Sequence, residues 1–270
     1  MRLLFRFFAV LALIAGFLLY VLSGKTDQYF SWTIEPSLTA AFLGASYWAA
    51  FVLIAWSSSR QRWEEARPAV LPVFVIACLL LVATLIHLER FHHDLFGRFW
   101  LVAYVAVPPV LLFCLWRQLS QPGADADRGA PLVRATSLPV LLRALLALQA
   151  LVMLGVGAAL YVSPGSADSI WPWQLTPLTA RAVGAFVFGF GAAAAGAVVE
   201  NHLQRFRGAA LAYATLGALE LVAALRYTED FTGASAREVI YLAFVGSVLI
   251  AGLYGFTGSR AASSASSRFT

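Results

Sequence analysis

Long uninterrupted apolar runs constrain this chain more than any other feature of its sequence. Residues 73–86 and 182–199 contain no charged side chain and show no alternation of apolar and polar positions. About 20 mainly apolar residues in a helix are enough to cross the ~30 Å hydrocarbon core of a bilayer. Alternating short segments would instead indicate a membrane β-barrel. Eight segments have the helical pattern, and they comprise residues 3–22, 38–56, 69–88, 99–116, 138–162, 178–199, 209–225 and 239–256.

The composition supports an all-α polytopic membrane bundle with the lipid bilayer as its partner. Hydrophobic residues make up 60% of the 270-residue chain and charged residues 12%, against about 45–50% and about 25% in soluble domains. These values exclude a disordered chain, a collagen and a disulfide scaffold. They also argue against a nucleic-acid-binding protein despite the net charge of +5, because a soluble domain of this size needs a polar surface.

The distribution of basic residues predicts the orientation of the eight segments. One set of alternate connections, together with both termini, holds 13 of the 19 Lys and Arg residues, and the other set holds 6. Cytoplasmic loops carry the excess of basic residues. We therefore expect a multi-pass protein of a bacterial inner membrane with both termini in the cytoplasm.

An internal repeat divides the chain into two similar halves. Several pairs of identical residues are separated by 141 positions, and after a one-residue deletion further pairs are separated by 140. The first group includes Tyr20 and Tyr161, Gly24 and Gly165, Asp27 and Asp168, Trp32 and Trp173, and Pro36 and Pro177. The second includes Thr39 and Thr179, Gly44 and Gly184, Glu89 and Glu229, and Phe91 and Phe231. This spacing predicts a tandem duplication.

The duplication predicts two four-helix repeats, residues 1–117 and 138–257. Because each repeat has an even number of spans, both share one topology, and the pseudo-two-fold axis should follow the membrane normal. Residues 118–137 read as a flexible cytoplasmic linker, rich in Gly, Pro, Ala and Asp. Residues 258–270 are rich in Ser and Ala, and we expect a disordered cytoplasmic tail.

Glu220 is the most informative single residue, because it lies deep within the seventh segment. A carboxyl group there is costly, so it should face protein or water. Gln149 lies at a similar depth in the fifth segment, and a hydrogen bond between the two would be possible if their helices face each other. Pro108 and Pro109 should kink or unwind the fourth segment. We expect these four residues to line a ligand or proton site between the repeats, and the alternative is that Glu220 only joins two helices.

The outer connections contain a second group of candidates. Trp32 and Glu35 precede the second segment, Trp173 precedes the sixth, and Arg226 and Glu229 end the seventh. Tryptophan belts and charged helix ends account for such residues in many membrane proteins. The functional alternative is a pair of lid-like loops that cover an outer cavity.

The histidines next to the third segment suggest a weak candidate for a metal site. His87, His92, His93 and Asp94 could supply imidazole and carboxylate ligands for zinc or copper on the outer face. The second repeat supplies no matching histidine. Haem is disfavoured, because the sequence offers no pair of histidines at mid-membrane depth.

The sequence contains no catalytic motif such as a zincin helix, a nucleotide loop or a nucleophile elbow. We therefore expect small-molecule or ion binding, or transport, at the interface between the repeats. One alternative is a non-catalytic scaffold or assembly subunit, which would dock other membrane proteins through small-residue faces such as residues 184–196. Another is a membrane enzyme that acts on a lipid at the outer headgroup level through His92, His93 or Asp94.

Overall fold

The structure, a computed structural model, describes residues 2–60, 67–93, 95–120, 136–231 and 235–266. Within these residues the secondary structure is entirely helical, as the sequence predicts. The long helices are α1 (Arg2–Tyr20), α3 (Ser37–Ser59), α5 (Val70–Ile86), α6 (Leu95–Leu119), α7 (Val140–Val162), α9 (Pro177–Glu200), α10 (Leu203–Arg226) and α11 (Ala236–Ser266). Two short helices, α2 (Thr26–Tyr29) and α8 (Ala167–Ile170), lie in the connections that follow α1 and α7.

Several of these helices are suited to a membrane by length and composition. Five could each cross a bilayer: α3, α7, α9, α10 and the Ala236–Ser259 part of α11. A sixth is possible if α1 and the short helical stretch Ser23–Tyr29, which meet at 86°, count as one span. The apolar helices Val70–Ile86 and Gly97–Phe113 are shorter. The chain is therefore a membrane protein with a helical bundle.

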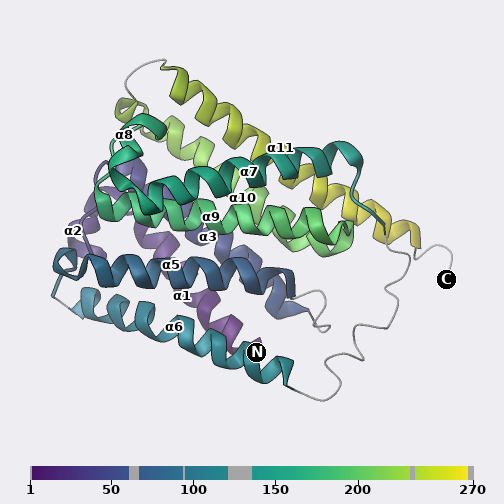
Figure 1. The fold of residues 1–270 in the computed structure, drawn as a ribbon, viewed down its shortest axis with the longest axis horizontal. Coiled ribbons are helices and arrows are strands. Elements are labelled where there is room, and N and C mark those ends of the chain that lie inside the picture. The colour runs from purple at the N-terminus through teal and green to yellow at the C-terminus, as the bar shows by residue number, and fades with distance from the viewer. Residues whose placement is uncertain (1, 61–66, 94, 121–135, 232–234, 267–270) are drawn as a thin grey trace.

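The helices run side by side along the long axis of the molecule, with α5 and α6 on one flank and α11 on the other (Figure 1). α1 packs on α3, and α7 packs on α9. α10 lies against both α3 and α11, and α5 lies against both α9 and α6. The apolar parts of α3, α9 and α10 are more than half buried, whereas those of α7 and α11 are mostly exposed. The first three therefore form the centre of the bundle.

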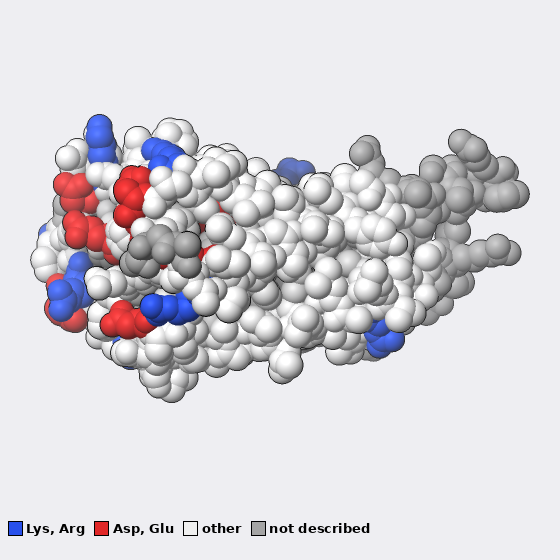
Figure 2. Space-filling model, turned by 90° about the horizontal axis from the view of Figure 1, so that it is seen from above, with Lys and Arg blue, Asp and Glu red and all other residues white. Residues whose placement is uncertain are grey.

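Charged side chains gather at the end of the bundle that carries α2 and α8. In Figure 2 the acidic groups cluster at that end, and the long middle of the visible face is nearly free of charge. Large exposed apolar residues cover the middle, including Leu148 and Leu151 of α7 and Ile250 of α11. An uncharged belt of this kind matches the hydrocarbon region of a bilayer.

Two glycines allow the central helices to approach closely. A Cβ at Gly44 of α3 would lie 2.5 Å from the backbone nitrogen of Tyr20 in α1. A Cβ at Gly184 of α9 would lie 2.8 Å from the backbone oxygen of Gly157 in α7. Small residues at such crossings let backbones meet, which favours helix association in lipid. The same explanation applies to Gly191, whose Cβ would meet α7 at Leu154.

Local capping interactions fix the ends of the central helices. Thr176 Oγ1 accepts from the Thr179 N–H at 3.3 Å, and Pro177 occupies the first turn of α9, as expected for a helix start. α9 ends at Asn201, whose φ of 44° is the left-handed conformation common at helix ends. The first turn of α3 is capped from a distance, because Asp230 Oδ2 accepts from the Leu38 N–H at 3.0 Å.

The structure differs from two sequence expectations about helix continuity. α6 passes through Pro108 and Pro109 as one continuous helix, so the predicted local unwinding is absent there. α11 extends to Ser266, through most of the segment expected to be a disordered tail. Most of the predicted linker (121–135) and the last four residues of the predicted tail (267–270) lie outside the described residues.

Candidate functional site

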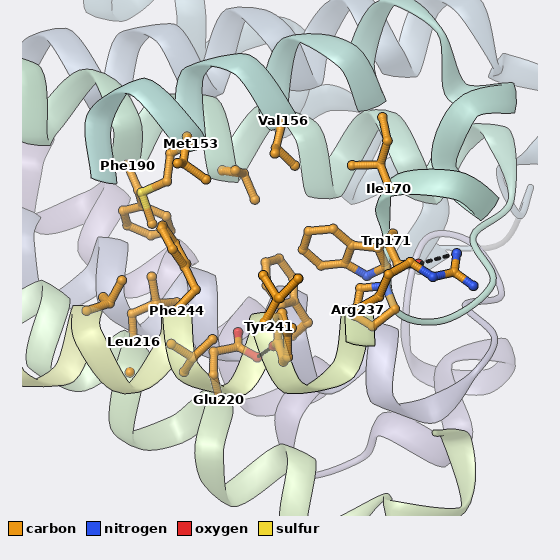
Figure 3. Close-up of a pocket in the computed structure, with 18 residues that line it drawn as sticks. Met153, Val156, Ile170, Trp171, Phe190, Leu216, Glu220, Arg237, Tyr241 and Phe244 are labelled. Carbon is orange, nitrogen blue, oxygen red and sulfur yellow. Dashed lines mark hydrogen bonds between the residues drawn. The ribbon is translucent and has the colours of Figure 1, made fainter. Parts of the chain in front are cut away.

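A cavity of about 200 Å³ surrounds the carboxyl group of Glu220. α7 and α9 form one wall, α10 and α11 form the other, and the α8 loop closes one end (Figure 3). Phe42 of α3 completes the lining, and the only charged groups in it are Glu220 and Arg237. The residues around the cavity are Phe42, Val152, Met153, Val156, Ile170, Trp171, Pro172, Val187, Phe190, Leu216, Gly217, Glu220, Arg237, Ile240, Tyr241, Phe244, Val245 and Val248.

Glu220 has one satisfied and one unsatisfied carboxyl oxygen. Its side chain is 1% exposed. The Tyr241 hydroxyl of α11 donates to Oε2 at 2.9 Å. The other oxygen, Oε1, is buried, and the described residues supply it with no hydrogen-bond partner. A buried polar atom without a partner costs about 1–3 kcal/mol. Oε1 is therefore a buried acceptor without a donor, in a residue that lines the cavity.

Aromatic rings form the end of the cavity near α8. The Trp171 ring lies 5.7 Å from the Tyr241 ring and 5.3 Å from the Phe42 ring, both in edge-to-face arrangements. Trp171 Nε1 is also buried, and no described residue accepts from it. Phe190 and Phe244 line the more distant part of the cavity (Figure 3). The cavity thus combines an apolar aromatic lining with a few polar atoms, as small-molecule sites generally do.

The cavity also reaches the outer surface of the bundle. Three of its lining residues, Val152, Ile170 and Ile240, are exposed. They belong to α7, α8 and α11, so the opening lies where α7 and α11 face each other. A molecule dissolved in the bilayer could reach the cavity by this route.

The structure does not bring together the four residues expected to share one site. Gln149 Nε2 donates to Ser247 Oγ of α11 at 2.9 Å, so Gln149 is bonded to α11 and not to Glu220. Pro108 lines a different cavity, and Pro109 follows it on α6 without lining either cavity. α11 supplies the partner for each residue, Ser247 for Gln149 and Tyr241 for Glu220.

The second cavity, of about 100 Å³, lies between α1, α3, α5 and α6. Its polar atoms are two tyrosine hydroxyls, since Tyr47 and Tyr104 are hydrogen-bonded to each other at 2.8 Å. Leu80, Trp100 and Phe186 are among its other lining residues. The hydroxyl groups satisfy each other, and the lining includes no charged side chain.

The outer-face candidates are divided between an aromatic layer and a large hollow. Trp173 Nε1 donates to Thr39 Oγ1 at 2.8 Å, and Trp32 packs against Phe30 at 4.8 Å between ring centroids. Arg226 donates to the Tyr20 carbonyl oxygen at 3.0 Å. Both tryptophans are buried, so they support the loops from inside.

Glu35 and Glu229 line the outer hollow, which has a volume of about 1090 Å³. Asp168, Asp230 and Arg237 are the other charged residues around it. Trp171, Pro172 and Arg237 line both this hollow and the cavity at Glu220, so the two spaces are adjacent. Arg237 lies between them and donates to the backbone oxygens of Asp168 and Trp171.

The histidines do not form a metal site with the other residues that the structure describes. His87 Nε2 is bonded to Arg181 at 2.7 Å. His92 lies 3.0 Å from the Phe30 carbonyl oxygen and 3.2 Å from Thr33 Oγ1, and His93 is exposed. No group of three potential ligands occurs among the described residues, and Asp94 lies outside them. The Arg181 guanidinium is bonded to His87 Nε2, so this ring nitrogen is not free to bind a metal in the structure.

Burial lowers the pKa of His87 below its ordinary value, and the neighbouring Arg181 guanidinium lowers it further. Glu89 acts in the opposite direction, with a carboxylate oxygen 3.8 Å from Nδ1. Burial and a nearby positive charge both disfavour the imidazolium form. His87 is therefore a neutral partner of Arg181 at neutral pH.

Sequence reasoning identified Glu220 but missed its partners. Tyr241 lies in the eighth segment with no sequence feature that marks it, and Phe42 is one of 20 phenylalanines. Trp171 was recognised only as a member of the aromatic belt. The packing of the helices places all three residues in the lining of the cavity, and no sequence motif marks them.

No family model, no curated protein and no solved structure matches this chain. The functional assignment therefore depends on the cavities, their lining residues and the charges around them. Of the spaces described above, the cavity at Glu220 alone joins a buried carboxyl group to an apolar lining.

Proposed function

We propose that the chain crosses a bacterial inner membrane eight times, as two four-helix units of residues 1–117 and 138–257. Helix contacts support the duplication, because the most extensive contacts of one unit have counterparts in the other. α1 packs on α3 as α7 packs on α9, and α5 packs on α6 as α10 packs on α11. α3 contacts α10 as α9 contacts α5, so the third helix of each unit lies against the second helix of the other.

Two hydrogen bonds give independent support for the duplication. The Tyr20 hydroxyl donates to the Leu219 carbonyl oxygen at 2.8 Å, and the Tyr161 hydroxyl donates to the Leu79 carbonyl oxygen at 2.7 Å. The tyrosines are 141 positions apart and the leucines 140, which are the two offsets of the sequence repeat. A pseudo-two-fold axis between α3 and α9, along the membrane normal, relates the two bonds.

The charge distribution favours the orientation with both termini in the cytoplasm. The end that carries α2 and α8 holds the acidic hollow and few basic residues, and the opposite loops hold most of the arginines. In this orientation the hollow opens to the extracytoplasmic side, in agreement with the preference of basic residues for the cytoplasm.

Within this architecture we infer that the protein binds a small, mainly apolar molecule in the cavity at Glu220. The observation that carries this proposal is the unpartnered Oε1 of a carboxyl group that is 1% exposed and lies at the wall of a cavity. Burial of such a group is costly, so it is retained where it has a use. The volume exceeds that of a 150 Å³ apolar cavity that binds benzene, so a molecule of one ring with a short substituent fits.

Two other roles have weaker support. A scaffold would need its small-residue faces free, but Gly184, Gly189 and Gly191 of α9 are already in contact with α7 or α5. An enzyme acting through outer histidines would need them in a shared groove, but His87 and His92 are bonded to other residues outside the hollow. Binding, with transport as its extension, is therefore the preferred function.

The test compares matched variants that fill one cavity each. Val245→Phe places a phenyl ring in the cavity at Glu220, and Val107→Phe does the same in the second cavity. Purified full-length protein is screened by thermal unfolding against small aromatic amines, alcohols and carboxylic acids, and extracted for co-purifying molecules by mass spectrometry. A ligand at 100 times its Kd should stabilise the parent by about 2.7 kcal/mol.

The proposal requires that Val245→Phe loses this stabilisation and any co-purifying molecule, while Val107→Phe retains both. Equal binding by the parent and Val245→Phe would contradict it. So would a parent protein that neither carries a molecule nor responds to any compound of the three classes.

A further inference from the structure

We propose that the ligand is a small organic cation, an ammonium group on an apolar body, which enters the cavity at Glu220 from the acidic outer hollow. This inference rests on the proposed function and specifies the charge of the ligand and its route. Three features carry it: the state of the Glu220 oxygens, the aromatic lining of the cavity, and the charges of the hollow.

The first feature is that the Glu220 carboxyl group already accepts a hydrogen bond. The Tyr241 hydroxyl donates to Oε2, which leaves Oε1 as an acceptor without a partner among the described residues. Burial by itself disfavours a charged carboxylate, and a cation bound beside the group supplies the opposite charge that stabilises it. An ammonium N–H directed at Oε1 supplies both the charge and the missing donor. A neutral hydroxyl would supply the donor only.

The second feature is the density of aromatic faces and edges around that carboxyl group. Phe42, Trp171, Phe190, Tyr241 and Phe244 all line the cavity. The electron-rich faces of such rings attract cations within about 6 Å, and aromatic cages are a common means of binding ammonium ligands. The rings of Trp171 and Tyr241 are 5.7 Å apart and meet edge to face, so the α8 end of the cavity is enclosed by π systems. The rest of the lining is hydrocarbon that suits the apolar body.

The third feature is the potential at the outer entrance. Glu35, Asp168, Glu229 and Asp230 line the hollow, and Arg237 is the one basic residue among its lining residues. Glu35, Asp168 and Glu229 are exposed, whereas Asp230 is partly buried and caps α3. A concave surface with an excess of one charge raises the local concentration of the opposite charge. The hollow therefore concentrates cations and repels anions.

The hollow and the cavity are adjacent. Both spaces are lined by Trp171, Pro172 and Arg237, and Figure 3 shows Arg237 and Trp171 together at one end of the cavity, with Glu220 and Tyr241 further in. Arg237 is held by the backbone oxygens of Asp168 and Trp171. Its position therefore does not depend on an ion pair with a carboxylate. A cation that enters from the hollow passes Arg237, whose single positive charge is outnumbered by the four acidic residues of the hollow.

The decisive experiment uses three probes of nearly equal size: phenethylamine, 2-phenylethanol and phenylacetate. Their binding to the full-length protein in nanodiscs of uncharged lipid is measured at pH 7 by quenching of tryptophan fluorescence. We expect the amine to bind about tenfold more tightly than the alcohol and the acid to bind least. In Glu220→Gln, which keeps the size and hydrogen-bonding capacity of the side chain, the amine should lose this advantage.

The route is tested with the double variant Asp168→Asn/Glu229→Gln, which removes two charges from the hollow and leaves the backbone contacts of Arg237 unchanged. At low salt the amine should associate with the variant about threefold more slowly than with the parent. Above roughly 0.5 M salt, where such charges are screened, the two proteins should have the same association rate. The rate for the alcohol should not change. An unchanged rate for the amine would overturn entry through the hollow.

The outcomes separate this inference from the proposed function. If the alcohol binds as tightly as the amine and both are lost in Val245→Phe, the cavity is a binding site but the ligand is not selected as a cation. If the amine keeps its advantage in Glu220→Gln, the assigned role of the carboxylate is wrong. If none of the three probes and no compound of the wider screen binds, both proposals fail.

Discussion

The two cavities contain different buried polar pairs, although they occupy equivalent places in the proposed duplication. Tyr241 donates to Glu220 in one, and Tyr104 bonds to Tyr47 in the other. Leu80 occupies the position that corresponds to Glu220, and Val187 corresponds to Tyr47 at the same offset of 140. Val187 is smaller than Tyr47 and leaves more space in the first cavity, and Glu220 adds a carboxyl group to its lining.

In the proposed duplication, this difference would separate stability from binding. In the second cavity the two hydroxyls are bonded to each other, and no charged side chain lines the space. In the first, Tyr241 satisfies half of a carboxyl group and the other half faces an aromatic cavity of about twice the volume. An equivalent aromatic pair lies in each half: the ring centroids of Trp32 and Phe91 are 5.2 Å apart, and those of Trp173 and Phe231 are 5.8 Å apart. The following substitutions break or sharpen this comparison.

The largest effect should come from Glu220→Leu, which makes the first cavity resemble the second. Amine binding should weaken by about 100-fold, because the charge and the acceptor are both removed. Unfolding should also require about 1–3 kcal/mol less free energy, since the Tyr241 hydroxyl loses its partner. Calorimetric titration and urea unfolding in detergent measure the two quantities. Leu80→Met, at the corresponding position, is the control and should change binding by less than about twofold. Retained binding in Glu220→Leu would remove Glu220 from the site.

The reciprocal change, Leu80→Glu with Tyr47→Val, should convert the second cavity into a binding site. Tyr104 would then donate to the new carboxyl group, and the space left by Tyr47 would admit a ligand. We expect the number of phenethylamine molecules bound per chain to rise from about one to about two, as measured by equilibrium dialysis. Leu80→Glu alone should bind no second ligand, because Tyr47 still fills the space. A stable double variant that binds one ligand would show that the aromatic surroundings of the two cavities differ in function.

Removal of one tyrosine hydroxyl from each cavity should distinguish the binding role of Tyr241 from the stabilising role of Tyr104. Tyr241→Phe should weaken amine binding by about tenfold, because Oε2 loses the donor that favours the carboxylate. Tyr104→Phe should leave binding unchanged and lower the free energy of unfolding by about 1–3 kcal/mol, since the buried Tyr47 hydroxyl becomes unsatisfied. The two titrations and two unfolding curves form a matched set. Equal effects of both variants on binding would contradict the assignment of distinct roles.

Much of the helical architecture could be predicted from the sequence, because lipid imposes strong and simple requirements on composition. Each of the eight predicted segments overlaps a long helix. The sequence predictions are incomplete where one sequence feature is compatible with two structures. Pro108 and Pro109 were expected to kink or unwind α6, and the helix is not unwound at them but continues to Leu119. The apolar segments themselves gave no information on which helices pack together, so the contacts α3 with α10 and α5 with α9 were not expected.

The candidate site was predicted only in part for a related reason. Burial cost identifies Glu220 from the sequence alone, because a carboxyl group deep in an apolar segment needs an explanation. Its partners are an ordinary tyrosine, tryptophan and phenylalanine, whose types are frequent in this chain. Tyr241 corresponds to Tyr104 only at an offset of 137, so the repeat at 140 and 141 does not reveal it. The sequence does not show which way a side chain points around its helix, so the possible hydrogen bond between Gln149 and Glu220 could not be distinguished from the observed one between Gln149 and Ser247.

The smallest predicted effect concerns the outer ends of α5 and α10, where the two halves again differ. His87 is bonded to Arg181, whereas Tyr227, 140 positions later, is bonded to Ser23. The pKa of His87 is lowered in the folded protein by burial and then by Arg181, so the unfolded chain takes up a proton first. Its contribution to stability is therefore complete above the ordinary histidine value of about 6.5 and decreases as the pH falls through that value toward the lower folded-state pKa. The melting temperature of the parent should fall between pH 7.5 and 5.5 by about 1–3 °C more than that of His87→Gln, which retains a polar group but does not titrate. Because the other histidines are present in both proteins, the difference between the two pH profiles reports on His87. Parallel profiles would mean that His87 and Arg181 separate freely, and the outer end of α5 would then be no more sensitive to pH than that of α10.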